Sequence, residues 1–152
     1  YKEANRLGNL VADIIQLSRL DEQQDEVVSM ESVELNELAE DVVNNLMRDK
    51  KNHLILTTSK IRNILSMIST IYNEVIHHPA DKLNEDMVER LKYLKMRFAY
   101  EAGREKAVKN LIEVAKIFEI IEWIGNDKQK CILFCKYMES IVAYHKFNGG
   151  KD

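Results

Sequence analysis

The sequence predicts an all-α protein, a single compact bundle of about five to six helices. Apolar residues recur at spacings of three and four in almost every segment, which is the period of an amphipathic helix. The chain of 152 residues has only 5 glycines and 1 proline, too few for the frequent turns of a β-sandwich or barrel. Hydrophobic residues make up 45% of the chain, which is enough for the core of about one domain.

The front of the chain contains two helical patterns separated by an acidic stretch. The first pattern consists of the apolar residues Leu7, Leu10, Val11, Ile14, Leu17 and Leu20. Residues 21–31 are acidic and lack a sustained period, which indicates a linker. The second pattern starts at Leu35 and reaches Met47. We therefore predict an N-terminal helical extension over residues 1–34 and a helical domain over residues 35–152.

The third helix has the clearest pattern and follows a polar run and a short segment, residues 54–56, that suits extended backbone. Its apolar stripe consists of Ile61, Ile64, Leu65, Ile68, Ile71, Tyr72 and Val75. A hydroxyl group of Thr57 or Thr58 is expected to cap its start by accepting a hydrogen bond from a free amide. The helix is expected to end at His77 and His78, because the residue before a proline disfavours helical backbone. The two histidines are expected to cap this end.

Three more helices complete the predicted bundle. Asn84 is expected to cap a helix that Gly103 interrupts or ends. The next helix covers residues 105–123, and the Gly-Asn-Asp turn after it leads into a last helix over residues 128–147. This last helix is apolar on two faces, which predicts a central position in the bundle or a surface shared with a partner.

The net charge of −3 is divided unevenly along the chain. Residues 1–56 hold 12 acids and 6 bases, whereas residues 57–152 hold 13 acids and 16 bases. Only the second part is suited to a polyanion, and only where its bases cluster. A net charge of +3 is weak for a protein that binds nucleic acid on its own.

Signatures of catalysis and of cofactor binding are missing from the sequence. It has no G-x-x-x-x-G-K-[ST] loop, no G-x-G-x-x-G after a strand and no H-E-x-x-H motif. Cys131 and Cys135 lack the second ligand pair usual in tetrahedral zinc sites, so we expect them to be core residues. We predict a non-enzymatic chain without metal or cofactor. Without an apolar run near 18 residues or a secretion leader, it is expected in the cytoplasm and not in a membrane.

Bases gather on the helix that starts after Asn84. Arg90, Arg97 and Arg104 are seven residues apart and form one row where the helix continues through Gly103. Lys92 and Lys95 lie on a neighbouring row. The alternative to a binding surface is a solvated face with ordinary pairs four residues apart, such as Arg97 with Glu101.

Two further groups of bases lie on other helices. Lys60 and Arg62 are in the first turn of the third helix, where free amides and the helix dipole also favour an anion. Lys136 and Lys146 lie on the last helix. Their neighbours include Tyr137, Tyr144 and His145, and bases interleaved with aromatic rings suit a nucleic-acid strand.

Three long segments carry a resemblance to a known family. They are LTTSKIRNILSMISTIYNE at residues 56–74, RLKYLKMRFAYEAGREKAVKNLIEVA at residues 90–115 and FCKYMESIVAYHKFNGGKD at residues 134–152. In this order they resemble the small subunit of type III-A CRISPR–Cas effector complexes, the Csm complexes. The resemblance covers about two thirds of the chain.

The resemblance implies an all-helical, non-catalytic subunit. Such subunits stack in several copies along the crRNA-bearing backbone and line the groove that holds crRNA paired with target RNA. The implied partners are crRNA and target RNA, the backbone and large subunits of the Csm complex and further copies of the chain itself. In such a multivalent assembly a few phosphate contacts per copy suffice, and they read backbone and shape instead of base edges.

The bases within the matching segments are the expected RNA-binding residues. They are Lys60, Arg62, Arg97, Arg104, Lys136 and Lys146. Tyr100 and Tyr144 are weaker candidates, with a place in the core as the alternative. Arg104 also has a structural alternative, a bond to Glu101 or to a helix end.

The front of the chain has a second, different resemblance. EANRLGNLVADIIQLSRLDEQ, followed by VELNELAEDVVNNL, is similar to the dimerisation helix and the ATPase entry of a sensor histidine kinase, without the phosphoacceptor helix or the ATP-binding boxes. The alternative function is therefore a helical dimerisation module of a signalling protein with no RNA binding. It would self-associate through Leu7, Leu10, Ile14 and Leu17. Residues 37–47 suit the small subunit's own N-terminal helix equally well.

Overall fold

A computed structural model gives the fold, and it describes residues 27–152. The helices in chain order are α3 (Val27–Asn44), η1 (Thr58–Ile61, a 3₁₀ helix), α4 (Arg62–Ile76), α5 (Glu85–Arg104), α6 (Lys106–Ala115), α7 (Ile117–Ile124) and α8 (Lys128–Phe147). Over these residues the only β pairing is in two isolated bridges, Arg48–Leu54 and Lys82–Asp127. The predicted all-α class is confirmed. None of the helices described is both long and apolar enough to cross a membrane.

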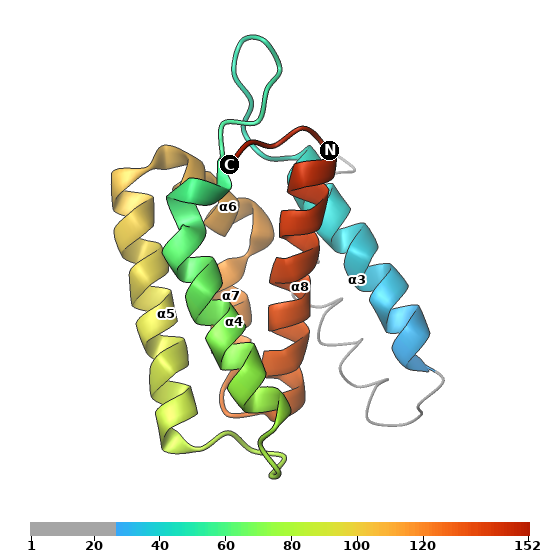
Figure 1. The fold of residues 1–152 in the computed structure, drawn as a ribbon, viewed down its shortest axis with the longest axis vertical. Coiled ribbons are helices and arrows are strands. Elements are labelled where there is room, and N and C mark those ends of the chain that lie inside the picture. The colour runs from blue at the N-terminus through green and yellow to red at the C-terminus, as the bar shows by residue number, and fades with distance from the viewer. Residues whose placement is uncertain (1–26) are drawn as a thin grey trace.

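Helix α8 stands at the centre of the bundle, against α3, α4 and α7 (Figure 1). Buried residues lie on several sides of it, because its apolar residues do not follow a single stripe. They are Cys131, Phe134, Cys135, Tyr137, Met138, Ile141 and His145. The predicted central position is confirmed. Helix α5 lies at the left edge of Figure 1, where it packs on α4 and α6.

Helix α3 packs on α8 through its apolar stripe. Leu35, Leu38 and Val42 are buried, and Ser140 Oγ lies 2.9 Å from Asn36 Oδ1 across the two helices. The helix begins at Val27, so the linker predicted over residues 21–31 is wrong from that position onward. The boundary predicted after residue 34 falls inside α3. The segment before it lies largely outside the described residues, so the division of the chain stays a prediction.

The start of α4 differs from the predicted threonine cap. A 3₁₀ turn precedes the helix, and neither threonine hydroxyl accepts a bond from a helix amide. Instead, the amides of Thr58 and Ser59 donate to the main-chain oxygens of Lys151 and Asp152, at 3.1 and 3.2 Å. The C-terminal tail therefore caps this helix, a contact between distant parts of the chain that local hydroxyl rules do not reveal.

Other predicted boundaries are confirmed. Asn84 Oδ1 accepts a bond from the Met87 amide at 2.9 Å and caps α5, which continues through Gly103 and ends one residue later. Helix α4 ends at Ile76, and the carbonyl oxygen of Asn73 lies 2.7 Å from His77 Nδ1. The cap predicted for His78 is wrong, since its Nε2 lies 2.9 Å from the carbonyl oxygen of Lys82 instead. Asp127 caps α8 from the predicted turn by accepting from the Lys130 amide at 3.0 Å.

The single helix predicted over residues 105–123 is wrong, because the chain breaks at Lys116. This residue has left-handed backbone, with φ 58° and ψ 39°, between α6 and α7. Ala115 and Ile117 on its two sides are both fully buried. The Tyr137 hydroxyl donates to the Ala115 carbonyl at 3.1 Å and satisfies the end of α6. The break lets α6 and α7 each turn an apolar stripe toward the core, which propensity alone does not predict.

Replacing Lys116 with glycine is expected to stabilise the protein by about 0.5–1 kcal/mol. A left-handed residue with a Cβ is strained, and glycine removes that strain at a smaller cost in chain entropy. Urea unfolding monitored by circular dichroism measures the change. Asn52, with φ 67°, is the matched control, since asparagine tolerates this region and Asn52→Gly should change stability less. A destabilised Lys116→Gly variant would contradict the assignment of strain.

Candidate nucleic-acid interface

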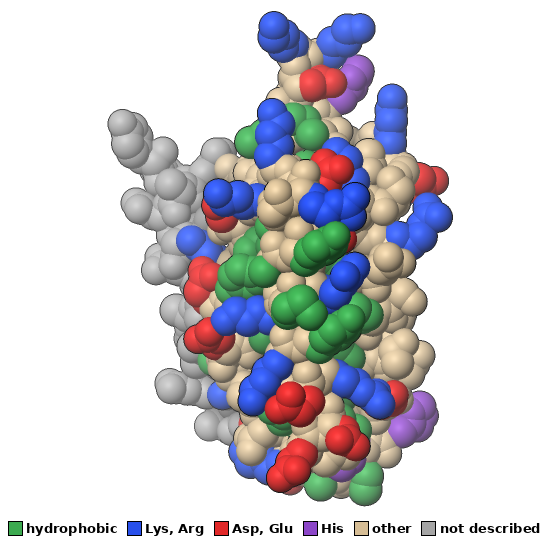
Figure 2. Space-filling view, turned by 90° about the vertical axis from the view of Figure 1, so that its left-hand side faces the viewer, with side chains coloured by type: hydrophobic (Ala, Val, Ile, Leu, Met, Phe, Trp, Pro, Cys, Tyr) green, Lys and Arg blue, Asp and Glu red, His purple; other side chains and the backbone are tan. Residues whose placement is uncertain are grey.

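The row of arginines predicted on α5 is present. Because α5 runs unbroken from Glu85 to Arg104, Arg90, Arg97 and Arg104 share one side of a continuous helix. We call these three residues the arginine row. Figure 2 turns this side of the molecule toward the viewer and shows blue Lys and Arg side chains along it.

Carboxylates hold each member of the arginine row in place. Arg90 pairs with Glu74 of α4. Arg97 Nη2 and Arg104 Nη1 lie 3.5 and 3.7 Å from the same oxygen of Glu101, so the predicted pair four residues apart and the structural alternative for Arg104 are both confirmed. One carboxylate facing two guanidinium groups leaves an excess positive charge at this end of α5.

A hollow of about 380 Å³ opens between the start of α4 and the end of α5. Its lining residues are Ser59, Lys60, Arg62, Asn63, Ile64, Glu101, Arg104 and Glu105. Three of the six predicted RNA-binding residues therefore meet in one place, although Arg62 and Arg104 are 42 positions apart in the sequence. Lys60 Nζ lies 3.4 Å from Glu105 Oε2, so the hollow mixes cations with carboxylates.

The end of α8 brings a fourth predicted base to the same end of the bundle, at the top of Figure 1. Lys146 Nζ donates to Asp152 Oδ1 at 2.8 Å. This bond lowers the pKa of the Asp152 carboxyl from its usual value, and the Thr58 hydroxyl and the nearby Arg62 charge add to the effect. The expectation of free amides beside Lys60 and Arg62 is wrong, since the tail occupies the amides of Thr58 and Ser59.

The remaining predicted residues lie elsewhere. Arg97 is two turns along α5 from Arg104. Lys136 is exposed on α8, and within the described part of the chain it makes no ion pair. The expected interleaving of bases and aromatic rings on α8 is wrong for two of its three rings, and the third, Tyr144, is half-buried against the core. Tyr137 and His145 are buried and bonded to the carbonyls of Ala115 and Leu56, so neither ring can reach a ligand.

The two cysteines occupy the core, as predicted. Cys131 and Cys135 are free and buried in α8. Their mutual hydrogen bond and their burial raise the pKa of the Cys135 thiol, which keeps it protonated and unreactive. Among the described residues, no group of three or more histidine, cysteine and acidic side chains could hold a metal ion.

The outer face of α5 carries an apolar feature of which the sequence pattern indicated only Tyr100, and the alternative of a core position for Tyr100 is wrong. Tyr93, Met96 and Tyr100 are 52%, 49% and 52% exposed. We call these three residues the α5 stripe. In Figure 2, green side chains lie in the middle of this face with blue ones around them. The sequence pattern contains a signal for this feature. Tyr93, Met96 and Tyr100 are three and four residues apart and therefore share one face, while Leu91, Leu94 and Phe98 form the core face of the same helix.

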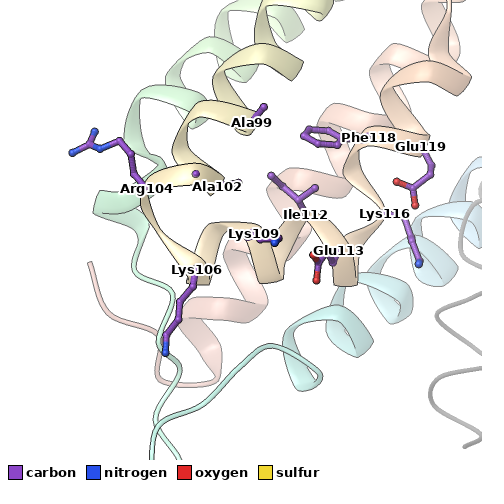
Figure 3. Close-up of a pocket in the computed structure, with 11 residues that line it drawn as sticks. Ala99, Ala102, Arg104, Lys106, Lys109, Ile112, Glu113, Lys116, Phe118 and Glu119 are labelled. Atoms are coloured by element: carbon purple, nitrogen blue, oxygen red, sulfur yellow. The ribbon is translucent and has the colours of Figure 1, made fainter.

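A wider groove of about 820 Å³ lies between the end of α5, α6 and the start of α7, and none of the residues of the α5 stripe lines it. Figure 3 shows Ala99, Ala102, Ile112 and Phe118 around its apolar floor. Its charged lining residues are Arg104, Lys106, Lys109 and Lys116, together with the acids Glu113 and Glu119.

Comparison with known proteins identifies the family. The model of the Csm2 Type III-A family matches residues 29–151. The chain belongs to this family. It is 45% identical over 114 residues to a CRISPR system Cms protein Csm2 from Streptococcus thermophilus, which covers 75% of this chain and 90% of the relative. A protein of the same name from Mycobacterium tuberculosis is 38% identical over 103 residues, which is 68% of this chain and 83% of the relative.

Membership in the Csm2 family confirms the resemblance that the three segments predict. The chain is the small subunit of a type III-A CRISPR complex, and other Csm components are its partners. The family match starts at residue 29, so it includes almost all of α3. Helix α3 is therefore part of the small subunit and not of a histidine kinase. The stripe from Leu7 to Leu17, on which the signalling alternative depends, lies outside the described residues.

Proposed function

We propose that this chain is a non-catalytic RNA-binding and assembly subunit of a type III-A CRISPR interference complex. It lines the groove for crRNA paired with target RNA, contacts the RNA backbone, and packs against the backbone and large subunits and further copies of itself. Its place of action is the cytoplasm.

The gathering of bases at one end of the bundle supports this proposal. Lys60, Arg62, Arg104 and Lys146 belong to η1, α4, α5 and α8, and these parts of the four elements lie at the same end of the bundle (Figure 1). Each has a carboxylate near it, so the cluster is fixed in place while only part of its charge is neutralised. Cations of this kind suit phosphate groups of any sequence. They hold a ligand and need supply no catalytic group.

Replacing Lys60 with alanine is expected to weaken binding of a crRNA–target duplex to the assembled complex and to flatten its salt dependence. Each phosphate contact that is lost should reduce the slope of log affinity against log salt by about 1 per bound copy. Fluorescence anisotropy over a series of salt concentrations measures this slope.

Lys82→Ala is the matched control for this experiment. Lys82 is also an exposed lysine, but it precedes the first turn of α5, a full helix length from Arg104. The Lys82→Ala substitution should leave the slope of log affinity against log salt unchanged. An unchanged slope for Lys60→Ala would remove Lys60 from the interface, and unchanged slopes for Lys60→Ala, Arg62→Ala and Arg104→Ala together would remove the hollow.

A further inference from the structure

The α5 stripe is not needed to hold the fold together. Helix α5 has a complete core face of its own, formed by Met87, Leu91, Leu94 and Phe98. About half of each side chain in the stripe is nevertheless exposed. A continuous exposed patch of large apolar side chains marks a contact with another molecule.

The charges beside the α5 stripe indicate a polyanion as the partner. Between Arg90 and Arg104 the helix carries five bases, and four carboxylates pair with them. The excess of cations is at Glu101, which Arg97 and Arg104 share. The arginine row borders one side of the stripe, while Lys92 and Lys95 follow on the other side. An apolar stripe with cations along both sides matches a strand that carries flat rings and phosphates together, which is the chemistry of a nucleic acid.

The ring of Tyr100 already takes part in stacking with cations. The guanidinium carbons of Arg97 and Arg104 lie 5.1 and 5.7 Å from its centroid. Arginine planes stack on bases as well as on tyrosine, so a base can join this arrangement without disrupting it. Tyr93 and Tyr100 are two turns apart, about 10 Å along the axis, which is roughly the length of three stacked nucleotides.

We propose that the α5 stripe binds unpaired RNA nucleotides, with the rings of Tyr93 and Tyr100 against the bases and the arginine row against the phosphates. Apolar side chains reach base faces only where the bases are unpaired, because a continuous duplex keeps them inside its stack. The inference rests on the proposed function and adds a second mode of contact to it. Since every base has a π face, this mode is independent of sequence.

The test compares single-stranded and duplex RNA on the full chain. A variant with both Tyr93→Ala and Tyr100→Ala is expected to bind a short unstructured RNA at least about tenfold more weakly, measured by fluorescence anisotropy. Its affinity for the same strand paired with its complement should change by less than about twofold. Both positions are exposed, so neither substitution opens a cavity in the core.

Two controls separate the rings from general effects. Tyr93→Phe combined with Tyr100→Phe retains both rings and should bind the single strand as the unaltered chain does. Phe147→Ala removes an aromatic ring that is 82% exposed at the end of α8 and should also change nothing.

Two results would overturn the inference. One is unchanged single-strand affinity in the double alanine variant. The other is a variant that binds RNA normally but no longer joins the complex, which would assign the α5 stripe to a protein partner. The two proposals can fail separately. If Lys60→Ala left the affinity for duplex RNA and its salt dependence unchanged while the tyrosine variant lost single-strand binding, the backbone contact at the hollow would be rejected. The proposal for the α5 stripe would then still hold.

Discussion

Replacing Phe98 with alanine should destabilise the protein by about 3–5 kcal/mol. The side chain is fully buried on the core face of α5, and its removal loses apolar burial and leaves a cavity that the surrounding helices only partly fill. The change is measured as the difference in unfolding free energy in urea. Because α5 also carries the arginine row, RNA binding should weaken together with stability.

The control for this substitution lies two residues further along the same helix. Tyr100→Ala removes a large aromatic side chain that is half exposed, so its effect on stability should be within about 0.5 kcal/mol. Helix propensity and side-chain size are comparable at the two positions, and burial is the main difference. A loss of less than about 1 kcal/mol for Phe98→Ala would be incompatible with the packing of α5.

Replacing Gly150 with alanine should detach the C-terminal tail and cost about 1–3 kcal/mol. A Cβ at this position would lie 2.2–2.4 Å from three ring atoms of His145. The buried ring has no room to withdraw, since its Nε2 bonds the Leu56 carbonyl at 2.6 Å. The tail must therefore move, and the amides of Thr58 and Ser59 lose their acceptors.

Hydrogen exchange measures this outcome at individual amides. In the Gly150→Ala variant, Thr58 and Ser59 should exchange faster, whereas the interior of α5 should exchange as before. Gly103→Ala is the control, because a Cβ there meets no atom within 4 Å and alanine favours helix. If Gly150→Ala kept the protection of Thr58 and Ser59, the contact between the tail and η1 would be disproved.

The sequence predicts the helices well where the signal is local. The cap at Asn84, the end of α4 before Pro79 and the central α8 each follow from neighbouring residues, and all three are observed. The predictions are wrong where the local backbone conformation depends on contacts with a segment that is distant in the sequence. Lys116 adopts left-handed backbone because α6 and α7 must both reach the core, and the start of α4 is capped by residues more than ninety positions away.

In the candidate interface, too, the features set by one helix are predictable, and those set by contacts between distant segments are not. The arginine row is a property of one helix, so a spacing of seven predicts it. The meeting of Lys60 and Arg62 with Arg104 depends on how α4 lies against α5, which no spacing contains. Tyr137 and His145 were misjudged because a ring on a helix can face either way, and only packing shows that both are buried.

The position of α8 also has a consequence for how the chain is made. Helix α3 leaves the ribosome before α8, its main packing partner, which begins roughly 80 residues later. At typical synthesis rates α3 waits about 4–16 s with Leu35, Leu38 and Val42 uncovered. The acidic residues in the sequence of the same helix place negative charge next to this apolar stripe, and like charge opposes the association of nascent chains.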